Sequence, residues 1–136
     1  MVYIDSSALA KLYVIEPESQ AVERWVRASM PYVATSRVTY AEILSSLVRC
    51  LGDGRISPVE YRLQKKAFLA DWSSLNVVEL SSATLASADR LIELHGLRGF
   101  DAIHLCSALW IGKPAFACCD QRLCSAAAAE GLPLAP

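Results

Sequence analysis

Apolar residues alternate along the chain between short continuous runs and longer stretches with helical spacing. The continuous runs are typical of strands that are buried on both faces, and they predict strands over residues 2–4, 31–34, 76–80 and 115–119. Between the runs, apolar residues recur every three to four positions, as on one face of a helix. We predict helices over residues 6–13, 17–29, 36–51, 58–72, 82–94, 101–111 and 120–127.

Polar residues and glycines at the ends of these stretches support the predicted helices. Ser57-Pro58-Val59-Glu60 combines a capping serine, a proline and an acid, which is a complete helix start. Thr35 or Ser36 is expected to cap the helix before it, and Ser81 or Ser82 the one after it. Gly52 and Gly96 are expected to end helices.

Strands that alternate with helices, without hairpin turns between them, indicate parallel pairing through right-handed crossovers. We therefore predict an α/β fold, a three-layer α/β/α sandwich with a central parallel sheet of four to five strands. The length of 136 residues suits a single domain over residues 1–136. We find no repeat, linker or low-complexity segment in the sequence.

Composition narrows the class of protein. Hydrophobic residues make up 54% of the chain, yet no run approaches the roughly 20 apolar residues of a membrane span. The sequence begins directly with a strand and shows no secretory signal, so we expect a cytoplasmic protein without a membrane partner. A net charge of −1 gives no reason to expect tight, non-specific nucleic-acid binding, so any such partner must be held locally.

The five cysteines are an odd number in a chain without an export signal, and we expect them to be reduced. Cys118 and Cys119 are adjacent and no C-x-x-C pair occurs, so a structural zinc site is not expected.

Acidic residues stand at equivalent places in this outline. Asp5 and Asp120 follow predicted strands, Glu42 lies near an apolar helical stripe, and Asp101 opens an apolar helix. Parallel strands bring their carboxyl ends to one edge of a sheet, so these side chains could converge there. The alternative is that they act separately, as two helix caps, one Asp stabilised by the helix dipole and one solvated Glu.

Converging carboxylates favour a hard divalent cation. Mg²⁺ and Mn²⁺ take oxygen ligands, often one or two carboxylates with several waters and a phosphate oxygen. Without a metal, like-charge repulsion should make such carboxylates bind protons more tightly than isolated ones. Spacing alone leaves the metal site and the separate caps both open.

Four segments in order carry a family resemblance: Tyr3–Leu9, Tyr40–Ile43, Phe100–Leu105 and Cys119–Leu123. They look like the successive motifs of PIN-domain ribonucleases, and more narrowly the chain resembles the VapC toxins of VapBC toxin–antitoxin modules. The resemblance runs from Val2 to the last strand.

The resemblance implies a catalytic and metal-binding site made of Asp5, Glu42, Asp101 and Asp120. It implies an endoribonuclease that uses Mg²⁺, or Mn²⁺ in its place, to activate water and to leave a 3′ hydroxyl and a 5′ phosphate on the cut RNA. Ser6, or Ser7, would help to orient water or phosphate. The family often has Ser or Thr where this chain has Cys118, which bears on how the region around Asp120 is held.

The resemblance also implies partners. Similar toxins receive an antitoxin segment in a groove, here expected around Leu12, Tyr13, Trp25 and Leu47, and form homodimers. The rival interpretation is a PIN-like RNA- or protein-binding module without catalysis, which only an activity assay separates from the enzyme.

We expect structural roles for the other polar residues near these motifs. His104 follows Asp101 by three residues and lies in an apolar helix, where a histidine is more often a hydrogen-bonded core residue than a ligand. Arg37 and Arg98 flank the acidic motifs and could hold RNA phosphates, but pairing with a carboxylate is the simpler expectation for each.

Overall fold

Four parallel strands form one sheet in the order β3-β2-β1-β4 in the structure, a computed structural model that describes residues 1–135. The strands are β1 (Val2–Ile4), β2 (Val33–Ser36), β3 (Asn76–Val78) and β4 (Ala115–Ala117). In register, Val2 of the central strand pairs with Val33 on one side and Ala115 on the other. A single bridge between Phe116 and Leu134 is the only further pairing in the described part of the chain.

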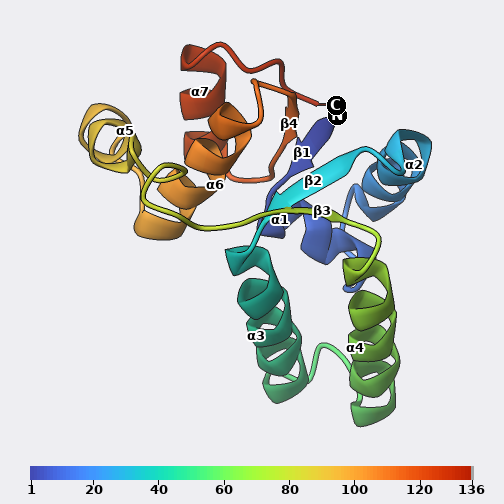
Figure 1. Ribbon diagram of the computed structural model, residues 1–136. Helices are drawn as coiled ribbons and strands as arrows, with labels where there is room; N and C mark the ends of the chain where they lie inside the picture. Colours follow the sequence, from blue (N-terminus) through green and yellow to red (C-terminus); the bar gives the residue numbers. More distant parts are fainter. Residues whose placement is uncertain (136) are drawn as a thin grey trace.

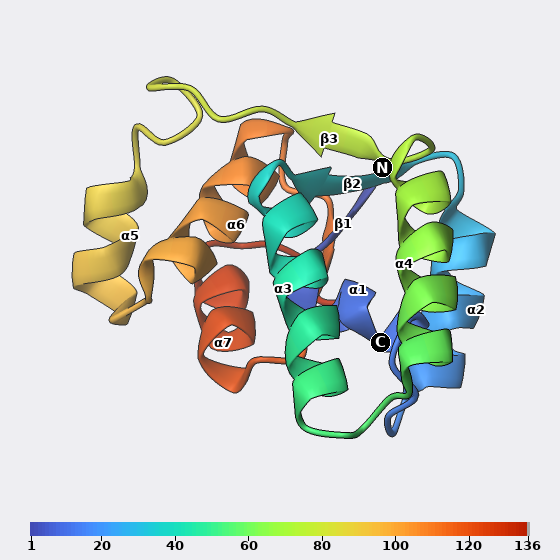
Figure 2. The ribbon, with the colours of Figure 1, turned by 90° about the horizontal axis from the view of Figure 1, so that it is seen from below.

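Helices cover both faces of this sheet (Figures 1 and 2). One layer contains α1 (Ser6–Leu9) with its continuation η1 (Ala10–Leu12), α2 (Ser19–Ser29), α3 (Val38–Gly52) and α4 (Pro58–Trp72). The other contains α5 (Ala88–His95), α6 (Gly99–Trp110) and α7 (Gln121–Ala129). The predicted three-layer α/β/α architecture with a parallel sheet is thus confirmed.

Successive strand residues face opposite layers, and each layer packs an apolar core against the sheet. Tyr3 of β1 and Phe116 of β4 stack on one face at a centroid distance of 5.3 Å and pack with Leu105 of α6. Ile4 and Ala117, the next residue in each strand, pack into the second core between the sheet and α1–α4. Burial on both faces explains why these strands read as unbroken apolar runs.

The expected helix caps at Thr35 and Ser36 are wrong, because both residues belong to β2 and are fully buried. Thr35 Oγ1 donates to the carbonyl oxygen of Ile4 at 2.8 Å and lies 2.7 Å from Thr39 Oγ1. Because the sheet itself satisfies this hydroxyl, the strand accommodates a polar residue that local preference would place at a helix start.

The helix predicted from residue 82 is shorter than expected, because α5 begins only at Ala88. Ser81 caps a turn instead, since its Oγ accepts a hydrogen bond from the Thr84 N–H at 3.0 Å. The start of α4 is as predicted: Ser57 Oγ accepts from the Glu60 N–H, and the Glu60 carboxylate accepts from the Ser57 N–H.

Within residues 1–135, no helix has the length and apolar character needed to cross a lipid bilayer.

Candidate active site

A cavity of about 640 Å³ opens at the C-terminal edge of the sheet, and all four predicted acids line it. Asp5 directly follows β1, and Asp120 follows the neighbouring β4 and caps α7. Glu42 comes from α3 and Asp101 from the first turn of α6. The structure thus brings these side chains around one cavity, while their role in catalysis or metal binding stays a prediction.

Asp5 is the most buried of the four acids, with 3% of the residue exposed. Its Oδ1 accepts a hydrogen bond from the Ala8 N–H at 2.9 Å and so caps α1. Burial raises the pKa of the Asp5 carboxyl, partly offset by the charge of His104 and by hydrogen bonds from Ala8 and Ser7. Higher proton affinity was expected from repulsion between carboxylates, but the largest cause is loss of solvent.

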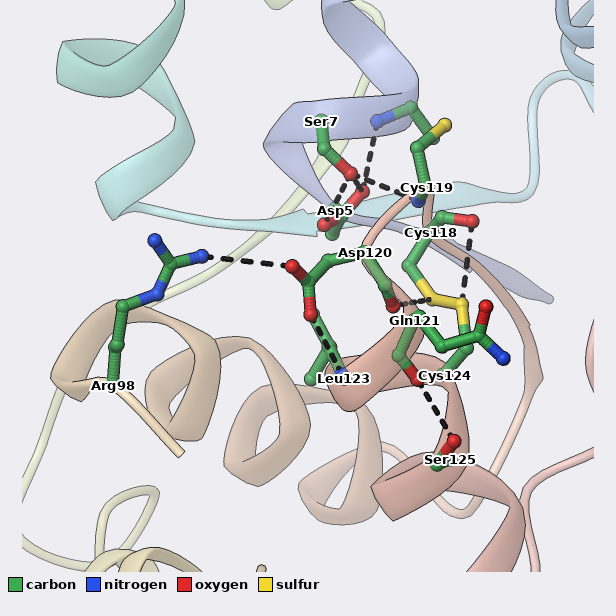
Figure 3. Close-up of a disulfide and its surroundings, with 11 residues drawn as sticks. Asp5, Ser7, Arg98, Cys118, Cys119, Asp120, Gln121, Leu123, Cys124 and Ser125 are labelled. Carbon is green, nitrogen blue, oxygen red and sulfur yellow. Dashed lines mark hydrogen bonds and ion pairs between the residues drawn. A yellow bond between two sulfur atoms is a disulfide. The ribbon is translucent and has the colours of Figure 1, made fainter. Parts of the chain in front are cut away.

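Ser7 ties Asp5 to the neighbouring strand end (Figure 3). Its hydroxyl lies 2.8 Å from both carboxylate oxygens of Asp5, to which it donates, and it accepts from the Cys119 N–H at 2.9 Å. Ser6, which the sequence favoured as the supporting serine, instead has its Oγ 3.5 Å from His104 Nε2. The direct support of Asp5 therefore comes from Ser7.

Glu42 extends from α3 into the cavity, and its carboxylate is hydrogen-bonded to a buried histidine. Its Oε2 lies 2.8 Å from Nε2 of His104, whose side chain is 1% exposed against 21% for Glu42. The other ring nitrogen, Nδ1, lies 2.8 Å from the hydroxyl of the buried Tyr3. His104 is therefore a hydrogen-bonded buried residue, as expected, but one of its partners belongs to the candidate site.

Asp101 and Asp120 share an arginine that sequence reasoning placed beside them. Arg98 Nε donates to Asp101 Oδ2 at 3.0 Å, and one of its terminal nitrogens lies 3.7 Å from Asp120 Oδ2. Figure 3 shows the guanidinium directed at Asp120, whose Oδ1 accepts from the Leu123 N–H at 2.9 Å. The guanidinium supplies a positive charge between two of the four acids.

A disulfide joins Cys118 and Cys124 beside Asp120, which contradicts the expectation that all five cysteines are reduced (Figure 3). The chain reverses at Asp120, so the end of β4 meets the first turn of α7 and the two Cα atoms lie 6.1 Å apart. Counting cysteines does not detect such proximity. Cys50, Cys106 and Cys119 are free thiols. The position where the family often has a hydroxyl is thus covalently tied to α7.

The oxygen atoms that line the cavity suit a hard cation, although the four carboxylates lie too far apart to form a closed ligand set. No three Asp, Glu, His or Cys side chains in residues 1–135 are grouped closely enough to form a ready metal site. The four carboxylates nevertheless supply the oxygen ligands that Mg²⁺ and Mn²⁺ prefer, and Mg²⁺ often keeps several waters and few direct protein ligands. The Arg98 guanidinium between Asp101 and Asp120 indicates that this edge favours a positive charge.

Arg37 and the residues of the predicted groove lie outside the acidic cavity. Arg37 forms an ion pair with Glu79, as expected for a carboxylate-pairing arginine. Leu12 and Tyr13 line a separate cavity of about 310 Å³ between η1, α2 and α4. Trp25 and Leu47 do not line it; Leu47 is 1% exposed and packs into the core. Two of the four residues predicted to form the groove thus line this cavity, and its role in binding an antitoxin stays a prediction.

Sequence reasoning missed part of the cavity wall. Ser45, Ser46 and Arg49 of α3 line it beside Glu42. Their spacing from Glu42, at three, four and seven residues along one helix, is the signal that could have placed them on the same face.

Comparison with solved structures shows the same fold in proteins of low sequence identity. The structure of VapC20 from Mycobacterium tuberculosis, described as a sarcin-ricin loop cleaving toxin, aligns with a TM-score of 0.72 at 17% identity, covering 97% of this chain and 96% of that chain. A toxin–antitoxin complex from Klebsiella pneumoniae aligns with a TM-score of 0.64 at 21% identity, covering 88% and 87%.

Sequence comparison is more specific. The model of the PIN domain matches residues 2–129. Ribonuclease VapC49 of Mycobacterium tuberculosis is 32% identical over 139 aligned positions, covering 100% of this chain and 95% of that protein. With a full-length match of this kind and the fold and acidic cavity described above, the chain belongs to the PIN-domain family and, within it, to the VapC ribonucleases.

Proposed function

We propose that this protein is a metal-dependent endoribonuclease, the toxin of a type II toxin–antitoxin module. The observation that carries the proposal is the convergence of Asp5, Glu42, Asp101 and Asp120 on one cavity at the C-terminal edge of a parallel sheet. The related VapC proteins are named ribonucleases, which supports RNA as the substrate.

Three of the four acids have distinct supports in this proposal. Asp5 is held by Ala8 and Ser7, Glu42 by His104, and Asp120 by the first turn of α7. These carboxylates would hold Mg²⁺ or Mn²⁺, whose Lewis acidity makes water a better nucleophile and offsets charge on the phosphate during hydrolysis. Arg98 and Arg49, at the cavity wall, supply positive charge for the flanking RNA phosphates.

The proposal includes two protein partners. An antitoxin is supported by the similarity to the toxin–antitoxin complex, and the cavity beside Leu12 and Tyr13 is the proposed place for its segment. A homodimer follows from the resemblance to VapC toxins and is part of the same proposal.

The direct test is RNA cleavage by the purified protein. We expect fragments with 5′ phosphate and 3′ hydroxyl ends in Mg²⁺ or Mn²⁺, and no cleavage after removal of metal with EDTA, restored by adding metal back. End-labelled structured and single-stranded RNAs resolved on sequencing gels measure this. Cleavage that persists in EDTA would refute the metal-dependent mechanism. Absence of cleavage, together with RNA or protein binding, would favour the non-catalytic module.

Arg98 should compete with a divalent cation for the cavity. Because its guanidinium contacts both Asp101 and Asp120, a metal that takes up these carboxylates must displace it. We expect Arg98→Gln to tighten Mn²⁺ binding by roughly twofold to fivefold, the modest effect of an exposed ion pair. Calorimetric titration of the metal-free protein measures the change.

Arg122→Gln is the matched control for Arg98→Gln. Arg122 lies nearby, but its guanidinium donates to the Gly96 carbonyl at 3.0 Å and contacts neither acid in the described residues. This variant should leave Mn²⁺ affinity unchanged. Weaker binding in Arg98→Gln would mean that Arg98 arranges the acids instead of competing for them.

A further inference from the structure

A chain of hydrogen bonds leads from the buried core to the wall of the acidic cavity. It starts at the Tyr3 hydroxyl, passes through both ring nitrogens of His104, and ends at the Glu42 carboxylate, with each contact at 2.8 Å. The three residues come from β1, α6 and α3, so the chain joins one strand and two helices. Tyr3 is 0% and His104 1% exposed, so water does not substitute for these contacts.

The partners determine which nitrogen of His104 carries hydrogen. The Glu42 carboxylate only accepts hydrogen bonds, so Nε2 must be a donor. Nδ1 lies 2.8 Å from the Tyr3 hydroxyl, which can donate to a neutral imidazole and accept from a protonated one. In either form both ring nitrogens have a partner, and Nε2 donates to Glu42.

The network leaves one oxygen of Glu42 uncommitted. Only Oε2 has a hydrogen-bond partner within residues 1–135, while Glu42 lines the acidic cavity and is 21% exposed at its side chain. A histidine with a purely structural role in the core would have both of its hydrogen-bond partners buried there. Here the last partner is a candidate ligand, which resembles the way that outer hydrogen bonds orient the ligands of metal sites.

We propose that His104, oriented by Tyr3, is a positioning residue that fixes the Glu42 carboxylate for divalent-cation binding. The inference rests on the proposed function, because it assigns Glu42 to the metal. His104 acts by donating Nε2–H to Oε2, which restricts rotation of the carboxylate. Tyr3 acts one step further away, by pairing with Nδ1 and so holding the imidazole ring in the orientation that directs Nε2 at Glu42.

The test compares two replacements of similar size at His104. His104→Gln keeps an amide donor that can reach Glu42, whereas His104→Leu keeps volume without a donor. We expect Mn²⁺ affinity, measured by calorimetry on the metal-free protein, to fall about 10- to 100-fold in His104→Leu and to be largely retained in His104→Gln. Thermal unfolding in EDTA verifies that each variant is folded.

Tyr3→Phe tests the positioning role independently if His104→Leu fails to fold. It removes one hydroxyl, so we expect a smaller loss of Mn²⁺ affinity than in His104→Leu. The ¹⁵N resonances of the His104 ring should show hydrogen on Nε2 in both proteins, and the Nδ1 resonance should shift in Tyr3→Phe, where the hydroxyl that contacts it is gone.

The outcomes separate the two proposals. If the wild type binds no Mn²⁺ and cleaves no RNA, the proposed function fails and the positioning role fails with it. If the wild type binds Mn²⁺ but folded His104→Leu binds it equally well, only the positioning role is overturned. If His104→Leu does not fold, unchanged Mn²⁺ affinity and ring resonances in Tyr3→Phe overturn it instead.

Discussion

Asp5→Asn is expected to abolish RNA cleavage and, in the metal-free protein, to raise the melting temperature. Cleavage should fall by more than about 100-fold, the upper end of the loss seen when a group that only supports a metal ligand is removed. The neutral amide cannot supply the anionic oxygen that a hard cation prefers. The shape of the site should survive, because asparagine is isosteric and can still accept from the Ala8 N–H.

The gain in stability follows from the buried charge. Burial raises the pKa of Asp5 in the folded protein, so folding favours the protonated carboxyl. Asp5 therefore adds stability below its unfolded pKa, and this contribution is lost as pH rises through the folded pKa. Above the folded pKa the ionised group weakens the fold, and the neutral amide removes that cost. The benefit should disappear in acid.

Thermal unfolding in EDTA at neutral pH, paired with RNA cleavage assays in Mn²⁺, measures both effects. Asp53→Asn is the control, since it makes the same change of charge at a side chain that is 66% exposed and outside the cavity. It should alter neither quantity appreciably. A lower melting temperature of metal-free Asp5→Asn would mean that the ionised carboxylate stabilises the fold, contrary to its burial.

The sheet and the convergence of acids could be predicted because each rests on a local signal. Unbroken apolar runs such as Val2-Tyr3-Ile4 predict strands buried on both faces, and parallel strands place Asp5 and Asp120 at one edge. Glu42 and Asp101 were located through helix patterns of the same kind. The resemblance to a known family then gave the four acids one role.

What could not be predicted depends on pairs of residues distant in the sequence. Tyr3 and His104 are 101 positions apart, and nothing in either segment indicates their hydrogen bond. Thr35 has the local sequence of a helix cap, and only its hydrogen bond to the Ile4 carbonyl shows that it belongs to a strand. The bond between Cys118 and Cys124 depends on where the chain reverses at Asp120. Such contacts are tertiary, so they outweigh local preference without leaving a local signal.

Phe68→Ala is expected to destabilise the protein by about 3–5 kcal/mol, the usual cost of removing a buried aromatic ring. Phe68 of α4 is 0% exposed and lies at the centre of an aromatic cluster. Its ring centroid is 5.4 Å from that of Tyr13, 5.9 Å from Tyr40 and 5.7 Å from Trp72. Alanine would leave a cavity among these rings, which come from three segments of one layer.

Urea denaturation measures this loss as a lower midpoint, with little change in the slope. Leu63→Ala is the control on the same helix, because Leu63 is 61% exposed and should change stability by no more than about 0.5 kcal/mol. Tyr40 lies on α3 two residues before Glu42, so the cluster also anchors the helix that carries a proposed ligand. Cleavage per folded molecule should therefore fall in Phe68→Ala but not in Leu63→Ala. Equal midpoints for the two variants would contradict the packing of α4 described above.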